Sequence, residues 1–486
     1  MSANAAAARV LYVLVPLGAA TLLSAAMAAA QVPASFDTSF SDRTMRVDYF
    51  HTLRLDERVI TLDRVVDDGP WAGSRTRLID DTNLGMYLFE VADRATNRVL
   101  YSRGFSTLAN EWETTPEGRR EWRTFHESLR FPWPKAPVQV VVKRRTPDRR
   151  FDQIWSMVIE PDSRFVNTAP PVPLGRVWTV FENGPAADKV DLLILGEGYT
   201  EAQLPRFHDD VRRLVEELFR YEPFKSRRAD FNVRAIDLPV REPGVHRPQA
   251  GAPRRTPLST EYNIFDSERY MLTRDNRALR EVAAAAPYEF LEILANEEHY
   301  GGGGILNAHA TAAAGSAEAG YLFVHEFAHH FAGLADEYYT SDVAYETGIS
   351  SRPEPWEPNI TATTDRQRLK WRDLVEPATP LPTPWPKAEF EARQREYQAK
   401  RRELRRTGAP ESEMAALFAG ERDFETALFG RAPFPRAVGA FEGAGYEAAG
   451  LFRPEQDCVM FSRNLVGFCR VCQRGITRVI DLYSRP

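Results

Sequence analysis

The pattern of apolar and polar residues changes near residue 170. From about 45 to 165, short segments of alternating character are separated by turn-prone stretches, without long helical periodicity. Alternation with a period of two is typical of strands that bury one face. The clearest segments are TMRVDYFHTLRL (44–55), GMYLFEVAD (85–93), APVQVVVKRRT (136–146) and QIWSMVIEPD (153–162). We therefore predict an N-terminal antiparallel β-sandwich over residues 36–166.

The proline-rich run TAPPVPLG follows and predicts a linker, for which we take residues 167–175. VDLLILGEGYT (190–200) then predicts a buried strand, the pattern from about 201 to 221 a helix, and ADFNVRAIDLPV (229–240) a second strand. A strand–helix–strand order predicts a right-handed crossover between parallel strands. Residues 176–486 are thus expected to form a mixed α/β domain, and the chain as a whole belongs to the α+β class.

Three later segments extend this picture. Residues 281–299 predict another helix. In YGGGGILNAHATAAA (300–314) the glycines favour a backbone bend or a close approach by another chain, before ILNAHATA extends as a strand. A flexible loop is the alternative, and His309 is interpreted as a polar strand residue, not a metal ligand. Residues 384–428, rich in Glu and Arg and interrupted near Gly408, predict a charged helical hairpin inserted at the surface.

The pentapeptide HEFAH (325–329) carries the chemistry. On a helix, His325 and His329 lie on one face, so both imidazoles can reach one metal ion, and Glu326 lies beside them to handle a water molecule. The apolar run before it and the apolar residues after it predict that this helix is buried. The spacing therefore indicates a zinc hydrolase; two helix histidines without metal are the structural alternative.

Catalytic zinc needs a third protein ligand. If the helix continued, Asp336 would lie roughly 16 Å along its axis from His325, too far for one ion. Gly333 can end the helix in a left-handed conformation and turn the chain back toward the metal. We predict Asp336 as the third ligand. Glu337 is the alternative, and the other acid of the pair would then accept a hydrogen bond from a ligand imidazole.

This arrangement resembles the metzincin metallopeptidases, in which HExxHxxGxxH or HExxHxxGxxD surrounds a glycine turn. Here Ala332 and Ala335 occupy the expected glycine and third-ligand positions, and Gly333 and Asp336 follow one residue later. The longer string HEFAHHFAGLADEYY, with YGGGGILN upstream and DCVM downstream, is similar to the IgA-peptidase-type zinc metalloendopeptidases. The resemblance runs from about Phe36 to the C-terminus.

The resemblance implies further roles. Met460 would be the methionine that underlies the zinc in metzincin-like folds, and the strand before the active helix would pair with extended substrate. Tyr446 is a candidate hydrogen-bond donor to the tetrahedral intermediate, and Glu442 a candidate to bind substrate or a backbone amide. Zn²⁺ is the expected cofactor.

The N-terminal segment predicts a protein that is exported from the cytoplasm. Residues 1–30 carry one charge, Arg9, ahead of the apolar run LYVLVPLGAATLLSAAMAAA. They predict a signal peptide cleaved before Gln31, with an uncleaved membrane anchor as the alternative. Removing them changes the formal net charge from −6 to −7 and leaves no basic patch that suggests nucleic acid. We expect a secreted or periplasmic protein without stable membrane association; its oligomeric state is left open.

The three cysteines, Cys458, Cys469 and Cys472, all lie near the C-terminus. In an oxidising compartment they predict one local disulfide and one remaining thiol, of unknown pairing. A structural zinc site would need a fourth ligand, which the neighbouring sequence does not supply. A redox CxxC lacks the surrounding βαβ pattern.

These observations predict an exported zinc endopeptidase that acts on a protein or peptide. Zinc would be held by His325, His329 and Asp336, with Glu326 as general base. A zinc hydrolase of a non-peptide amide or ester is the first alternative. A binding protein with a vestigial metal site is the second, and the intact HEFAH argues against it. The physiological substrate is not readable from the sequence.

Overall fold

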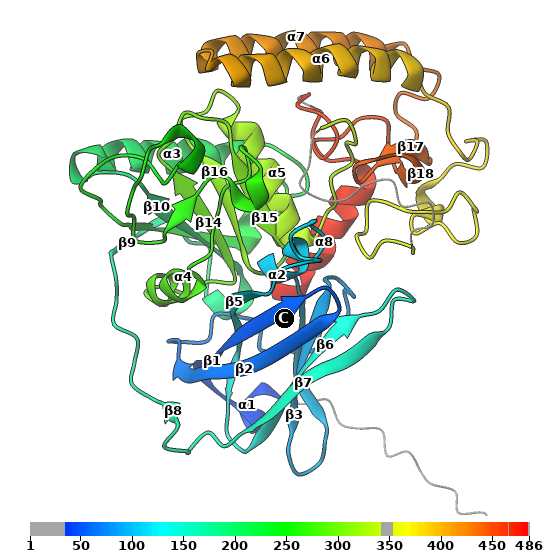
Figure 1. Ribbon diagram of the computed structural model, residues 1–486. Helices are drawn as coiled ribbons and strands as arrows, with labels where there is room; N and C mark the ends of the chain where they lie inside the picture. Colours follow the sequence, from blue (N-terminus) through cyan, green and yellow to red (C-terminus); the bar gives the residue numbers. More distant parts are fainter. Residues whose placement is uncertain (1–34, 342–352, 465, 485–486) are drawn as a thin grey trace, which may run out of the picture. The chain divides into compact units, whose positions relative to one another are not determined.

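The N-terminal part of the chain contains two four-stranded sheets. The computed structural model describes residues 35–341, 353–464 and 466–484 (Figure 1). The first sheet has the order β5-β1-β2-β8 and the second the order β4-β3-β6-β7. Their strands are β1 (Phe40–Arg54), β2 (Glu57–Asp67), β3 (Tyr87–Asp93), β4 (Val99–Phe105), β5 (Arg123–Pro134), β6 (Val138–Arg145), β7 (Phe151–Ile159) and β8 (Val166–Asn167), with short helices α1 (Phe36–Ser39) and α2 (Leu108–Trp112).

One hydrophobic cluster joins the two sheets. Val47 and Phe131 from the first sheet and Phe89 and Val140 from the second are all buried in it. The four alternating segments of the sequence are strands, as predicted, because alternation lets each strand bury one face against this cluster. The division at 167–175 stays a prediction, and residues Ala34–Pro486 form one compact unit.

The second part of the chain is built on a six-stranded sheet of order β15-β16-β14-β10-β11-β9. The four inner strands are parallel, and β15 and β9 pair antiparallel at the two edges. The strands are β9 (Arg176–Phe181), β10 (Val190–Glu197), β11 (Phe231–Asp237), β14 (Phe290–Ala295), β15 (Gly302–Ile305) and β16 (His309–Ala313). The described residues therefore combine helices with several sheets, as expected for an α+β protein.

The remaining elements accompany this sheet. The longer helices are α3 (Leu204–Leu218), α4 (Asn276–Ala283), α5 (Ala319–Ala332), α6 (Lys387–Thr407), α7 (Glu411–Gly430) and α8 (Arg470–Ser484). Two small hairpins pair β12 (Thr260–Glu261) with β13 (Leu272–Thr273) and β17 (Phe441–Ala444) with β18 (Glu447–Arg453). Short 3₁₀ helices are η1 (Ala186–Asp188), η2 (Glu201–Gln203), η3 (Arg228–Asp230), η4 (Pro248–Ala250), η5 (Ile264–Asp266) and η6 (Arg372–Leu374).

The predicted strand–helix–strand order and parallel pairing are confirmed: β10, α3 and β11 follow one another, and the two strands are parallel. The helix predicted over 281–299 is wrong. Only its first residues belong to α4, and Phe290–Ala295 are the fully buried strand β14, between β10 and β16. A short apolar run that is buried on both faces has no strand periodicity, so the pattern could not distinguish it from a buried helix.

The glycine run at 301–304 is part of the sheet, not a flexible loop. Gly302–Ile305 form edge strand β15, and α5 packs directly on β15 and β16 (Figure 1). A Cβ atom on Gly304 would lie 2.1 Å from the backbone oxygen of Glu326, and one on Gly302 would lie 3.0 Å from Cγ of Glu326. The glycines therefore let the HEFAH helix approach the strand closely. His309 is a buried residue of β16.

Residues 387–430 form two packed helices, α6 and α7, joined at Gly408, which has a left-handed φ of 64°. The predicted signal peptide, residues 1–30, lies outside the described residues. None of the helices in the described ranges combines the length and apolar character that crossing a membrane requires.

Candidate metal centre

Helix α5 brings together the two histidines of HEFAH. Their Nε2 atoms are 3.1 Å apart, as the spacing of four residues predicts. His330, the next residue, faces the core instead: its Nδ1 lies 2.8 Å from the carbonyl oxygen of Ile305, and its Nε2 accepts the N–H of Leu291 at 3.0 Å. Burial lowers the pKa of His330 to about 3, so it is a neutral core residue.

The helix ends where the sequence predicts. Gly333 adopts a left-handed conformation with φ 57° and donates its N–H to the carbonyl oxygen of His329 at 3.0 Å. The chain then turns back, and Oδ1 of Asp336 lies 2.9 Å from Nε2 of His325 and 3.3 Å from Nε2 of His329. A Cβ atom at position 333 would lie 2.7 Å from the ring of Trp356, so space as well as φ favours glycine.

Backbone carbonyl groups orient both imidazoles from behind. Nδ1 of His325 lies 3.0 Å from the carbonyl oxygen of Val459, and Nδ1 of His329 lies 2.5 Å from that of Leu334. An N–H at each Nδ1 leaves a lone pair on each Nε2, directed at the point that the two rings share with Asp336. The hydroxyl of Tyr321 is 3.1 Å from the same Nδ1 of His325.

These orienting groups were not identified from the sequence. Tyr321 is one helical turn before His325, so helical spacing could have indicated it. Val459 and Leu334 act through their main chains and leave no residue-type signal.

The electrostatics favour the approach of a cation. Burial by itself would raise the pKa of Asp336, but His329 and His325 hold it well below its ordinary value. Burial by itself would lower the pKa of His329, and Asp336 raises it to about 9. Asp336 therefore keeps its negative charge beside the two imidazoles.

Glu326 lies beside the histidines. One of its carboxylate oxygens and one ring nitrogen of each of His325 and His329 all lie within 4.8 Å of one another. Burial raises the pKa of Glu326, and the two histidines oppose that rise without cancelling it. A carboxylate with a raised pKa is a better proton acceptor.

Of the two adjacent acids, Asp336 belongs to this centre and Glu337 does not. The carboxylate of Glu337 is fully buried among the three cysteines, with Oε1 3.2 Å from Sγ of Cys472. The predicted disulfide is absent: all three cysteines are free, and Sγ of Cys458 and Cys472 are 3.9 Å apart, compared with about 2.05 Å in a disulfide. Glu337, far away in the sequence, thus lies beside the three cysteines as a fourth group able to bind a metal.

Three further residues have roles that the sequence predicted. The hydroxyl of Tyr446 donates a hydrogen bond to Oδ2 of Asp336. Met460 is fully buried, and its carbonyl oxygen accepts the N–H of Glu337 at 2.8 Å. Glu442 is engaged by Nζ of Lys387 at 2.7 Å and by the N–H of Gly450 at 3.4 Å, so a contact to a backbone amide, one of its two predicted roles, is present.

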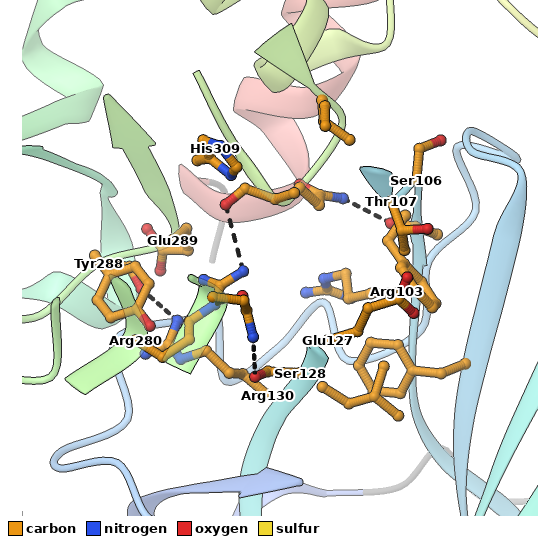
Figure 2. A pocket seen from close by; sticks show the side chains of 18 of the residues that line it. Arg103, Ser106, Thr107, Glu127, Ser128, Arg130, Arg280, Tyr288, Glu289 and His309 are labelled. Carbon is orange, nitrogen blue, oxygen red and sulfur yellow. Dashed lines mark hydrogen bonds between the residues drawn. The ribbon is translucent and has the colours of Figure 1, made fainter. Parts of the chain in front are cut away.

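Figure 2 shows a different cavity, of about 130 Å³, lined by residues from both parts of the chain. Its arginines are already engaged. Arg130 donates to the carbonyl oxygen of Tyr288 at 2.9 Å, Arg280 to that of Ala308 at 3.3 Å, and Arg103 to that of Ser102 at 2.8 Å. None of the residues that line it belongs to the histidine cluster, so it does not compete as the catalytic site.

The donor set fits zinc. Two imidazole nitrogens and one carboxylate oxygen are the ligand types of catalytic zinc, and donors about 2.0–2.1 Å from one tetrahedral ion lie roughly 3.3 Å apart. The separations between the three donors here are 2.9, 3.1 and 3.3 Å.

Comparison with known proteins agrees with this geometry. The model of the family described as IgA Peptidase M64 matches residues 179–480, which include the whole centre. That of the Peptidase M64 N-terminus matches residues 35–156. No curated protein matches the chain. The two matches cover most of the chain, and the protein belongs to the IgA peptidase M64 family of peptidases.

Proposed function

We propose that the protein is an exported zinc endopeptidase in which His325, His329 and Asp336 hold the metal. The observation that carries this proposal is the convergence of their three donor atoms, each 2.9–3.3 Å from the others. The family match supports peptide bonds as the substrate class. The position of Glu326 beside the two histidines supports its role as the general base.

When bound, zinc supplies Lewis-acid polarisation and lowers the pKa of water toward neutrality. The protein's own residues do the rest. Glu326 accepts a proton from the attacking water and then delivers it to the nitrogen of the leaving amine. The carbonyl oxygens of Val459 and Leu334 keep both imidazoles in the orientation that the reaction needs.

The strand directly before α5 is β16, which already pairs with β15 and β14 on its two sides, so we propose that extended substrate pairs with the edge strand β15 instead. Gly302 already accepts the N–H of Met271 and donates to the carbonyl oxygen of Arg269, both at 3.2 Å. Because strand residues alternate in direction, Gly304 is the next position whose backbone faces the same edge. An extended peptide would therefore pair at Gly304, next to Glu326.

The finer predictions about architecture and compartment belong to the same proposal. A β-sandwich over 36–166 is supported by the shared core of the two sheets, and a metzincin-like catalytic domain by Met460 close to the zinc ligands. The apolar N-terminal run of the sequence supports export.

Digestion of a denatured protein and of a peptide library by the purified protein tests the activity. We expect internal peptide bonds to be cleaved, cleavage to stop with a chelator and to return with Zn²⁺. Ester or amide hydrolysis without peptide cleavage would favour the non-peptide hydrolase. Neither activity in zinc-loaded protein would favour a binding protein.

A further inference from the structure

We propose that Glu337, Cys458, Cys469 and Cys472 form a second metal site, which binds a structural Zn²⁺ ion. The four side chains come from three separate segments: the turn after α5, the loop before Met460, and the start of α8. This inference concerns metal binding and does not rest on the proposed peptidase activity.

The spacing of the ligand atoms is that of a tetrahedral zinc site. All four lie within 4.8 Å of one another. For Zn–S bonds of about 2.3 Å and a Zn–O bond of about 2.0 Å, tetrahedral angles place sulfurs roughly 3.8 Å apart and oxygen roughly 3.5 Å from sulfur. The observed separations are 3.9 Å between the sulfurs of Cys458 and Cys472, and 3.2 and 3.9 Å from Oε1 of Glu337 to the sulfurs of Cys472 and Cys469.

The surroundings suit thiolates. The N–H of Cys469 donates to Sγ of Cys458 at 3.2 Å, and the N–H of Cys472 donates to Sγ of Cys469 at 3.4 Å. Cys472 lies in the first turn of α8, where the helix dipole favours negative charge. Backbone donors of this kind stabilise sulfur ligands without competing for the metal.

Glu337 supplies an independent indication. Its side chain is completely buried; Oε1 accepts a hydrogen bond from Asn359 at 3.0 Å, but Oε2 has no hydrogen-bond partner among the described residues. A buried carboxylate oxygen without a partner is costly. A metal ion held with the three cysteines removes that cost, because buried charges are stable when they coordinate metals.

A disulfide accounts for these observations less well. It would join two of the cysteines, leave the third beside Glu337 and give Oε2 of that carboxylate no partner. A metal ion uses all four groups at once. It would also connect segments next to the catalytic centre, since Glu337 follows Asp336 and Cys458 precedes Val459, whose carbonyl group orients His325.

Metal content tests the proposal directly. Full-length purified protein is loaded with excess Zn²⁺ and desalted, and zinc per chain is measured by mass spectrometry. We expect two ions in the wild type, one in the double variant His325→Ala, His329→Ala, and one in Cys469→Ser. Val466→Ser, an exposed position in the same loop, is the matched control and keeps both.

A second measurement covers the case in which cysteine variants do not fold. The His325→Ala, His329→Ala variant is loaded with Co²⁺ in place of zinc, and its near-ultraviolet absorption is recorded. Thiolate ligands give an intense sulfur-to-cobalt band, whereas imidazole and carboxylate ligands do not. We expect that band in this variant. Its absence overturns the proposal, as does a single thiol per denatured, unreduced wild-type chain, which would show a disulfide.

Discussion

Asp336 and Glu337 are adjacent in the chain, yet their carboxylates serve two different clusters. Oδ1 of Asp336 lies 2.9 Å from Nε2 of His325, and Oε1 of Glu337 lies 3.2 Å from Sγ of Cys472. Neighbouring residues in an extended segment point in opposite directions, so one short stretch after Gly333 can reach both.

Substitution of the two acids separates the clusters. Asp336→Ala removes one of three donors at the histidine site, and we expect its zinc affinity to fall more than about 100-fold, with loss of activity. Glu337→Gln is the comparison, because its carboxylate contacts the cysteines, and the histidine site should still bind metal. Zinc titration of both variants checks this. Equal loss of zinc from the histidine site in the two variants would contradict the assignment of Asp336 as the third ligand.

Glu326→Gln tests the general base. The substitution keeps the shape of the side chain and removes its capacity to accept a proton, so we expect kcat to fall at least about 100-fold while zinc content is unchanged. Peptide turnover and metal analysis on the same preparation measure both. Cleavage at the wild-type rate would exclude Glu326 as the base.

Tyr446→Phe distinguishes two roles for the tyrosine hydroxyl. In the structure this hydroxyl donates to Oδ2 of Asp336, which would make it a positioning residue for the ligand. We expect weaker zinc binding in Tyr446→Phe, by about 10–100-fold, and recovery of most activity at high zinc. A fall in kcat with unchanged zinc affinity and no recovery would instead support the predicted donation to the tetrahedral intermediate.

We expect the α6–α7 hairpin to be most stable in mildly acidic solution. His299 lies 2.8 Å from Glu411, at the start of α7, and 2.6 Å from Glu268. Burial alone would lower the pKa of His299, but both carboxylates raise it above its ordinary value. Burial alone would raise the pKa of Glu411, but His299 and Arg405 lower it to about 2.

His299 and Glu411 stabilise the hairpin over different ranges of pH. The contribution of His299 to the stability of the hairpin is fully present below its unfolded pKa of about 6.5 and is lost as pH rises through its raised folded pKa. The contribution of Glu411 is present above its unfolded pKa of about 4.5 and is lost as pH falls toward its folded pKa of about 2. We expect proteolysis of the hairpin to be slowest between those limits. In His299→Gln, the rate of proteolysis should no longer rise at alkaline pH. An unchanged rise would contradict the role given to His299.

Two glycine substitutions form a matched pair. Gly304→Ala places a Cβ atom 2.1 Å from the carbonyl oxygen of Glu326, so helix and strand must separate. We expect a loss of roughly 3 kcal/mol or more in the free energy of unfolding, with reduced activity. Gly420→Ala, in the exposed middle of α7 with no atom within 4 Å of the new Cβ, should gain up to about 1 kcal/mol. Denaturant unfolding measures both, and equal effects would contradict the packing argument.

The local pattern of residues in the sequence determined much of this protein's secondary structure. Alternation predicted the N-terminal strands, and the segment from β10 to β11 has the predicted parallel crossover, because both depend on residues close in sequence. HEFAH predicted two nitrogens on one helix face, and Gly333 predicted where the helix stops, since only glycine adopts that φ without steric cost.

Tertiary structure decided what local pattern could not. Phe290–Ala295 are a strand because β10 and β16 flank them, and the glycines at 302 and 304 are needed because α5 lies against them. The sequence favoured Asp336 as the third ligand and left Glu337 as the alternative; the fold directs Asp336 to the histidines and Glu337 to cysteines more than a hundred residues away. Distances between segments remote in sequence arise only from packing, so the second cluster became visible only in three dimensions.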